Sequence, residues 1–145
     1  MKPVVDRAAS ILYLGDNAGE IVFDRLLVEQ IGFGKVTFAV RGGPAINDAL
    51  QADADSTGLS DMVRVIDSGV DAPGTPLDLC SPAFLQTLSE SDLVLSKGQG
   101  NYETLSDLKR PVFFLFRIKC PLVSRHLGLP EGTLVVEGRN VKEPS

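Results

Sequence analysis

Six short runs of apolar and β-branched residues recur along the chain, and polar stretches follow them. The runs cover residues 11–14, 36–40, 62–66, 93–95, 112–116 and 134–136. A short run that is apolar on both faces is typical of a strand buried within a sheet. The pattern therefore predicts six buried strands.

Longer stretches with helical spacing of apolar residues lie between these runs. They cover residues 21–31, 44–54, 82–88, 102–108 and 121–127, and a serine or cysteine followed by proline opens two of them. In residues 21–31, apolar side chains occupy positions 21, 22, 26, 27, 28 and 31, which leaves Asp24, Arg25, Glu29 and Gln30 for the solvent side. Strands that alternate with helices favour a parallel sheet with right-handed crossovers. We therefore expect one α/β domain over residues 1–145, with an open, three-layer, Rossmann-like sheet and helices on both faces.

Composition narrows the classes of partner. The 145 residues are 43% hydrophobic, which is enough for one domain with its own core. The 14 basic residues are scattered among 19 acidic ones and the net charge is -5, which argues against a nucleic-acid partner. The chain shows no signal peptide, no long apolar span and only two cysteines, Cys80 and Cys120. We expect a cytoplasmic protein that neither binds nor crosses a membrane.

Polar side chains gather after the predicted strands. The first, second, fourth and fifth predicted strands are followed in turn by Asp16, Asn17 and Glu20, by Arg41, Asn47 and Asp48, by Lys97, Asn101 and Glu103, and by Arg117 and Lys119. Ligands of open α/β sheets bind beyond the carboxyl ends of the strands. We therefore expect these side chains to converge on one edge of the sheet and to form a binding site there.

The donors available at this edge suit a metal and a phosphate group. Asp16, Asn17 and Asp48 offer oxygen atoms without histidine or thiolate, which favours magnesium or manganese over zinc. The glycine-rich turn KGQGNYE offers backbone N–H groups to an anion. The substrate's remaining charge would be neutralised by basic side chains, namely Lys97, Lys119 and Arg41. Neither a P-loop nor a GxGxxG motif is present.

Each candidate also has a purely structural explanation. Asp16 or Asn17 alone can cap the helix that follows. Asp48 can occupy the first turn of the predicted helix 44–54, where the helix dipole favours a carboxylate. A lysine directly after a buried strand is often only solvated. The functional interpretation rests on the recurrence of such residues after strand upon strand.

Five motifs carry a family resemblance. In order they read LGDNAGE, RGGPAINDAL, SGVDAPGT, SKGQGNYETL and KCPLVSRHLG. Over residues 11–136 the chain resembles the metal-dependent damage-control phosphatases, also called the ARMT-like or DUF89 family, in their stand-alone prokaryotic branch. The resemblance implies an α/β catalytic domain that hydrolyses phosphate esters, such as sugar phosphates among damaged or side-product metabolites.

The resemblance also implies roles for individual residues. A divalent metal would be held by Asp16, Asn17 and Asp48, and Lys97 would contact the substrate phosphate. Asn101 and Glu103 would line the same pocket. Glu20 and Arg41 correspond less specifically to the family pattern and would bind substrate.

We therefore expect metal-assisted hydrolysis of small phosphomonoesters, with magnesium, manganese, cobalt or nickel as the cofactor. Asp16, Asp48 and Lys97 would be catalytic, and Lys119 would help Lys97 to stabilise the phosphoryl oxygens. The sequence leaves open whether water or a carboxylate of Asp16 or Asp48 attacks phosphorus, and we rank water first. Two alternatives remain, an S-adenosylmethionine-dependent carboxyl methyltransferase with Asp16 or Glu20 near its ligand, and a non-catalytic metal- or metabolite-binding domain.

The beginning of the chain departs from the family pattern. Family members usually carry a helical region ahead of the first motif, whereas only MKPVVDRAA precedes the first strand here. From this we expect a shortened chain with a more exposed site, or a chain that recruits a second copy of itself or a separate helical partner.

Overall fold

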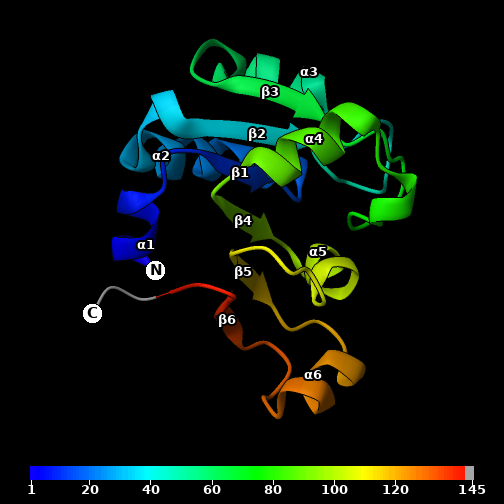
Figure 1. Ribbon diagram of the computed structural model, residues 1–145. Helices are drawn as coiled ribbons and strands as arrows, with labels where there is room; N and C mark the ends of the chain where they lie inside the picture. Colours follow the sequence, from blue (N-terminus) through cyan, green and yellow to red (C-terminus); the bar gives the residue numbers. More distant parts are fainter. Residues whose placement is uncertain (143–145) are drawn as a thin grey trace.

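A single six-stranded sheet forms the centre of the molecule. The computed structural model describes residues 1–142. Its strands are β1 (Ile11–Leu14), β2 (Val36–Val40), β3 (Arg64–Asp67), β4 (Leu93–Lys97), β5 (Val112–Arg117) and β6 (Leu134–Arg139). They lie in the order β3-β2-β1-β4-β5-β6, and all neighbours pair in parallel except β5 and β6 (Figure 1). The predicted open, mainly parallel sheet is confirmed.

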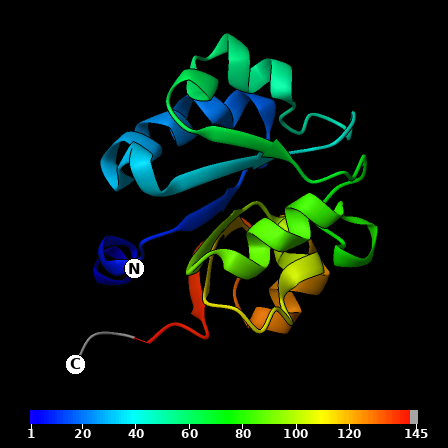
Figure 2. The same ribbon diagram turned by 45° about the horizontal axis from the view of Figure 1, so that its top comes forward.

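Helices cover both faces of this sheet, as the sequence predicts. They are α1 (Lys2–Arg7), α2 (Ile21–Ile31), α3 (Gln51–Ser56), α4 (Pro82–Glu90), α5 (Gln99–Leu105) and α6 (Pro121–Leu127). Helices α2 and α3 pack on one face, and α4, α5 and α6 pack on the other (Figure 2). The chain changes face between β3 and β4, so the switch point of the sheet lies between β1 and β4. None of the described helices is long and apolar enough to cross a membrane.

Strand β1 joins the two halves of the hydrophobic core. Ile11 and Tyr13 point into the cluster under α2, whereas Leu12 and Leu14 point into the cluster under α4 and α5. This alternation follows from the period of two in a strand. All four residues are buried because β1 has a strand on each side and helices on both faces. Both faces of β1 therefore require apolar side chains.

The prediction that all six strands are buried is wrong for the two edge strands. In β3, which begins at Arg64 and not at residue 62, Arg64 and Asp67 are exposed. In β6, Leu134 is 80% exposed and Val136 is also exposed. Each of these strands has a neighbour on one side only. Apolar runs mark strands well, but they do not separate central strands from edge strands.

Two predicted helices differ in extent from those in the structure. Residues 44–54 were expected to be helical, but α3 begins only at Gln51, because hydrogen bonds to the loop after β1 hold the preceding residues in a turn. Helix α5 begins at Gln99, directly after Gly98, and ends at Leu105. In contrast, α4 and α6 begin at their predicted prolines. The structure adds α1, which the apolar pattern did not predict.

The orientation of α2 also differs from the prediction. Its buried residues are Ile21, Asp24 and Val28, which lie on one helical face. Asp24, expected on the solvent side, is only 2% exposed, whereas Val22 and Leu26, expected in the core, are exposed. The apolar residues of this helix extend over more than half of its circumference, so their spacing did not identify the face that meets the sheet. A carboxylate is thereby brought into the core.

Phe38 of β2 offers a test of this packing. Its side chain is fully buried and stacks on Tyr13, with ring centroids 5.0 Å apart. We expect Phe38→Ala to lower the free energy of unfolding by about 3–5 kcal/mol, because the substitution leaves a cavity. Urea unfolding measures the change. Phe23→Ala is the matched control, since Phe23 is 71% exposed, and its effect should stay within about 0.5 kcal/mol. Similar losses in both variants would contradict this core.

Candidate functional site

The loops after β1 and β2 pair with each other at the carboxyl edge of the sheet. Asn17 and Asp48 form an isolated antiparallel bridge. The N–H of Ala18 donates to the Asn47 carbonyl at 2.8 Å, and the N–H of Ala49 donates to the Asp16 carbonyl at 2.8 Å. This pairing brings together three candidates, Asp16, Asn17 and Asp48, that are up to 32 positions apart in sequence.

These contacts rule out two of the structural explanations. Asp48 does not lie in the first turn of a helix, because α3 begins three residues later. Asn17 stands at the N-cap position of a short 3-10 helix, Ala18–Glu20, but its side chain makes no capping bond. Instead, Asn17 Nδ2 donates to Glu20 Oε1 at 3.0 Å. The polar side chains of these loops therefore serve purposes other than capping.

Asp16 sits in an unfavourable position for a negative charge. Burial, the charge of Asp48 and the charge of Glu20 raise the pKa of Asp16 from its ordinary 3.8 to about 6. Lys119 and Arg41 oppose the rise, but they only partly offset it. A cation bound beside Asp16 and Asp48 would remove the repulsion that contributes to the shift.

The loop after β4 closes over Asp16 at a glycine. Gly98 has a φ of +87°, and a Cβ atom at this position would lie 2.3 Å from the Asp16 carboxyl group. Its N–H donates to the Leu115 carbonyl at 3.0 Å, so this amide is used within the sheet. Only glycine satisfies both the left-handed backbone and the close approach. Gly98 therefore allows the contact between this loop and the Asp16 carboxylate.

Arg41 is buried next to the acidic loops and makes three side-chain hydrogen bonds. Its Nε donates to Asp48 Oδ2 at 2.8 Å, its Nη1 to Thr75 Oγ1 at 3.1 Å and its Nη2 to Asn101 Oδ1 at 3.1 Å. The residue is 6% exposed. Arg41, a predicted substrate-binding residue, holds Asp48 and the connections after β3 and β4 in the structure.

Asn101 is likewise enclosed by the protein. Besides accepting from Arg41 and Thr75, its amide donates to the Lys97 carbonyl at 2.7 Å and to the Gly15 carbonyl at 3.3 Å. These bonds use the full capacity of the side chain. Thr75 was not among the candidates, although it is the last residue of the motif SGVDAPGT. Asn101 and Thr75 tie the loops after β1, β3 and β4 to one another.

Lys97 lies at the end of β4 between two carboxylates. Its Nζ donates to Glu20 Oε2 and to Asp24 Oδ1, both at 2.9 Å. Although burial works against protonation, these partners raise the pKa of Lys97 above its ordinary value. The contact with Lys97 and a hydrogen bond from Asn17 lower the pKa of Glu20, although burial opposes this. Sequence reasoning missed Asp24, because apolar residues surround most of α2 and their spacing does not identify its buried face.

Asp16, Glu20, Lys97 and Lys119 all line a hollow of about 550 Å³. The rest of its wall comes from β5, β6 and the glycine-rich turn, through Gly98, Gln99, residues 115–117 and residues 134–136. Gln99 links the turn to the neighbouring loop by accepting from the N–H of Lys119 at 2.7 Å. Glu103, a candidate, accepts from Gln99 Nε2 at 2.7 Å but does not line the hollow.

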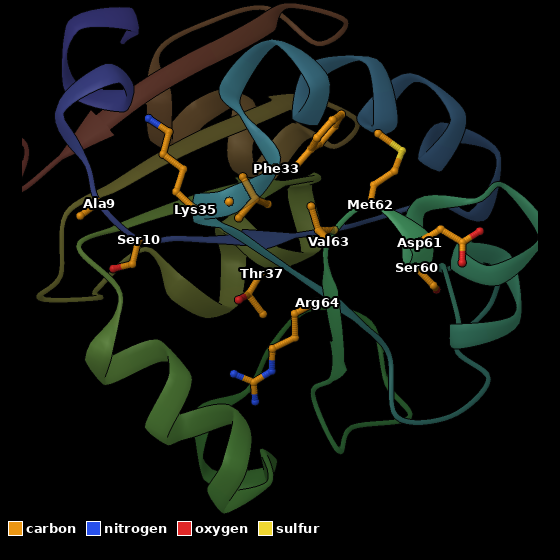
Figure 3. A pocket seen from close by; sticks show the side chains of 12 residues that line it. Ala9, Ser10, Phe33, Lys35, Thr37, Ser60, Asp61, Met62, Val63 and Arg64 are labelled. Atoms are coloured by element: carbon orange, nitrogen blue, oxygen red, sulfur yellow. The ribbon is translucent and has the colours of Figure 1, made fainter.

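A second hollow, of about 570 Å³, lies at the amino edge of the sheet. Lys35, Thr37, Asp61 and Arg64 are among its lining residues (Figure 3). The Lys35 and Arg64 side chains extend in different directions, and Lys35 Nζ donates to the Val5 carbonyl at 2.7 Å. Its basic groups do not converge, unlike those at the carboxyl edge.

The donor set at the carboxyl edge is small. Within residues 1–142, no group of three or more His, Cys, Asp or Glu side chains is arranged to hold a metal ion. Two carboxylates and an amide, from Asp16, Asp48 and Asn17, are the oxygen donors that the paired loops supply. Magnesium commonly uses only one or two protein carboxylates and completes its coordination with water and substrate oxygens.

Comparison with known proteins identifies the family. The model of the damage-control phosphatase ARMT1-like domain matches residues 2–135. This chain belongs to that family. The resemblance noted in the five sequence motifs is thereby confirmed.

Archaeal relatives agree with this assignment. Damage-control phosphatase PH1575 of Pyrococcus horikoshii is 43% identical over 135 residues, which are 90% of this chain and 47% of the relative. A damage-control phosphatase of Archaeoglobus fulgidus is 37% identical over 134 residues, which are 90% of this chain and 46% of the relative. The crystal structure of a DUF89 family protein from Pyrococcus horikoshii superposes with a TM-score of 0.88 at 42% identity, over 94% of this chain and 49% of the other. The chain spans about half the length of these relatives.

Gly98→Ala tests the closure of the loop over Asp16. A methyl group would force both a left-handed alanine and a clash with the Asp16 carboxyl group, so we expect a loss of about 1–3 kcal/mol in the free energy of unfolding. Thermal or urea unfolding measures it. Gly34→Ala is the control, because the space that its methyl group would occupy has no neighbouring side chain or loop within 4 Å, and it should change stability by less than about 0.5 kcal/mol. A fully tolerated Gly98→Ala would contradict the close approach.

The raised pKa of Asp16 predicts a pH dependence of stability. Between its ordinary pKa of 3.8 and about 6, the folded chain holds a proton on Asp16 that the unfolded chain has lost. The contribution of this group therefore makes the free energy of unfolding fall as pH rises through that window. We expect Asp16→Asn to remove this part of the fall. Urea unfolding from pH 4 to pH 7 with EDTA, in both proteins, measures the difference, and parallel pH profiles would contradict the shift.

Proposed function

We propose that this chain hydrolyses phosphate esters of small metabolites in a reaction that depends on a divalent metal ion. The observation that carries the proposal is the Asn17–Asp48 bridge, which sets two carboxylates and an amide at the edge where Lys97 ends its strand. The names of the two damage-control phosphatases among the relatives support the same class of reaction. Because the chain spans only about half the length of those proteins, its activity and its substrates are part of the proposal.

The residues at this edge fit a hard cation. Asp16, Asn17 and Asp48 would hold it, since their oxygen atoms are the ligands that magnesium and manganese prefer. The negative charges of Asp48 and Glu20 help to raise the pKa of Asp16, and such an ion would neutralise them. When bound, the ion would supply positive charge that polarises the phosphoryl group and favours attack by water. Cobalt and nickel also accept oxygen and water ligands and belong in the same assay.

Lys97 is suited to bind the phosphoryl group. An ammonium group has three N–H bonds, and two of those of Lys97 are taken by Glu20 and Asp24. The remaining N–H would donate to a phosphoryl oxygen in the hollow, which Lys97 lines. Lys119 lines the same hollow and would add positive charge from the side of β5. Arg41 would act indirectly, because its bonds hold Asp48 in place.

The size and wall of the hollow suit a small phosphomonoester such as a sugar phosphate. Its volume of about 550 Å³ is in the range of small-molecule pockets, roughly 300–1,000 Å³. Charged side chains such as Asp16, Lys97 and Lys119 line it together with apolar ones such as Leu115 and Leu134. The phosphate would bind the lysines, and the remainder of the substrate would contact the apolar side chains.

Two features bear on cellular setting and assembly. Cys80 and Cys120 are both free thiols, which fits a reducing compartment such as the cytoplasm. Val22, Phe23 and Leu26 are exposed on the outer face of α2. An exposed apolar face of this kind fits association with a second copy or with a helical partner.

The assignment is tested with p-nitrophenyl phosphate and magnesium, manganese, cobalt or nickel. We expect metal-dependent release of nitrophenol, and a loss of about a hundredfold or more in kcat/KM for Asp16→Asn and for Asp48→Asn, since each removes a charged oxygen donor. Calorimetric titration with Mn²⁺ should show weaker binding in the same two variants.

Asp61→Asn is the matched control, because Asp61 lies at the opposite edge of the sheet, in the second hollow. It should keep both activity and Mn²⁺ affinity. Equal phosphate release by the wild type and Asp16→Asn would refute the phosphatase assignment. Turnover of S-adenosylmethionine without hydrolysis of any phosphate ester would favour the methyltransferase, and Mn²⁺ binding without either reaction would favour a binding domain.

A further inference from the structure

Asp24 is a buried carboxylate behind the candidate site that the proposed reaction does not yet use. It lies on α2, is 2% exposed and does not line the hollow. Its Oδ1 accepts from the Tyr13 hydroxyl at 2.6 Å and from Lys97 Nζ at 2.9 Å. Its Oδ2 is buried and makes no hydrogen bond to any residue of the described chain. All its polar contacts therefore converge on one oxygen.

Burying a carboxylate in this way lowers the stability of the fold, which indicates that its charge has a use. A buried carboxylate loses its hydration and requires a cation or several hydrogen bonds in return. Asp24 has one cationic partner, Lys97, and one neutral donor, Tyr13. A leucine at position 24 would complete the apolar face formed by Ile21 and Val28 without that cost. The ion pair with Lys97 is the contact that a leucine would not supply.

The Asp24 carboxylate, which Tyr13 holds, has a more firmly fixed position than the Glu20 carboxylate. Tyr13 is fully buried in β1 and its ring is stacked on Phe38, and burial together with Asp24 raises its pKa, so its hydroxyl stays a donor. The Glu20 side chain is 40% exposed and lies on the rim. Of the two carboxylates that hold Lys97, Asp24 is therefore the one with a rigid position.

We infer that Asp24, held by Tyr13, is a positioning residue that fixes the Lys97 ammonium so that its free N–H faces the hollow. The inference rests on the proposed function, in which Lys97 binds the substrate phosphate. Asp24 reaches Lys97 from behind, whereas the substrate would reach it from the hollow. Without Asp24, Lys97 would keep only its contact with Glu20 and would be free to move along the rim.

A labelling experiment tests the contact without any assay of activity. Lys97 in the full chain is acetylated with a low concentration of acetic anhydride at pH 8, and the rate is followed by mass spectrometry against the other lysines. Asp24→Asn keeps the shape of the side chain but removes the charge that raises the pKa of Lys97. We expect Lys97 to be acetylated severalfold faster in this variant, because a lower pKa increases the fraction of free amine at pH 8.

Two further variants complete the labelling test. Tyr13→Phe removes only the hydroxyl group and should accelerate acetylation of Lys97 to an intermediate extent. Glu29→Gln removes an exposed carboxylate from the same helix and should change nothing. If Asp24→Asn does not fold, as judged by circular dichroism, Tyr13→Phe decides the outcome. Wild-type labelling of Lys97 in a folded Asp24→Asn, or in Tyr13→Phe in that case, would overturn the inference.

A double-mutant cycle then asks whether Asp24 acts through Lys97. Asp24→Asn, Lys97→Met and the double variant are compared in kcat/KM for p-nitrophenyl phosphate and in unfolding by urea. We expect the double variant to be no less active than Lys97→Met, and more stable than it, because Lys97→Met alone leaves a buried carboxylate without its cation.

The outcomes separate this inference from the proposed function. Independent, multiplicative losses in kcat/KM would overturn a role of Asp24 through Lys97. A wild type that hydrolyses no phosphate ester would refute the proposed function, whereas the labelling and unfolding results would still report on the contact between Asp24 and Lys97. A melting temperature lowered in Asp24→Asn with unchanged labelling of Lys97 would reduce Asp24 to a structural residue.

Discussion

The buried guanidinium of Arg41 connects the loops on which the site is built. It pairs with Asp48 and donates to Thr75 and Asn101, so three separate connections of the sheet meet at one side chain. Burying a charge is costly, and the cost is recovered only with a close carboxylate and further acceptors. Lysine has no planar fork with which to reach the same three partners. The loops at this edge are therefore organised before any ligand arrives.

The charges of the site follow a simple division. Asp48 is neutralised by Arg41, and Glu20 and Asp24 share Lys97. Asp16 forms no ion pair with any described residue, and it is the carboxylate whose pKa rises to about 6. Asp16 is thus the acid of this group without a cationic partner, and it lies where Gly98 allows a close approach of the backbone. Positive charge bound here would relieve the repulsion that contributes to its raised pKa.

The sequence predicted much of the fold because parallel sheets need strands that are apolar on both faces. It also predicted that Asp16, Asn17, Asp48 and Lys97 would share an edge, since this follows from parallel strand direction alone. It failed where long-range contacts override local pattern. Residues 44–50 have helical spacing, yet the bridge to Asn17 holds them in a turn.

The contacts of individual polar groups were also beyond the reach of the sequence. Arg41 was expected to bind substrate, and in the structure it is enclosed by three acceptors from the connections after β2, β3 and β4. Asp24 was expected in solvent because it is one of the polar residues between the apolar positions of α2, but apolar residues surround most of this helix. The face of such a helix that meets the sheet depends on the residues that it contacts there, in this case Tyr13 and Lys97.

Strand β6 has a consequence of a different kind. Because it runs antiparallel to β5, its first residue, Leu134, pairs with the last residue of β5, Arg117, at the carboxyl edge. Part of the wall of the hollow is thus made by the start of an edge strand, and its side chains Leu134 and Val136 are exposed and lie outside the core clusters. Substitutions at these two positions would leave the parallel strands that carry the charged groups undisturbed. In the proposed reaction, substitutions at Leu134 and Val136 would therefore reshape the pocket without altering the charged groups.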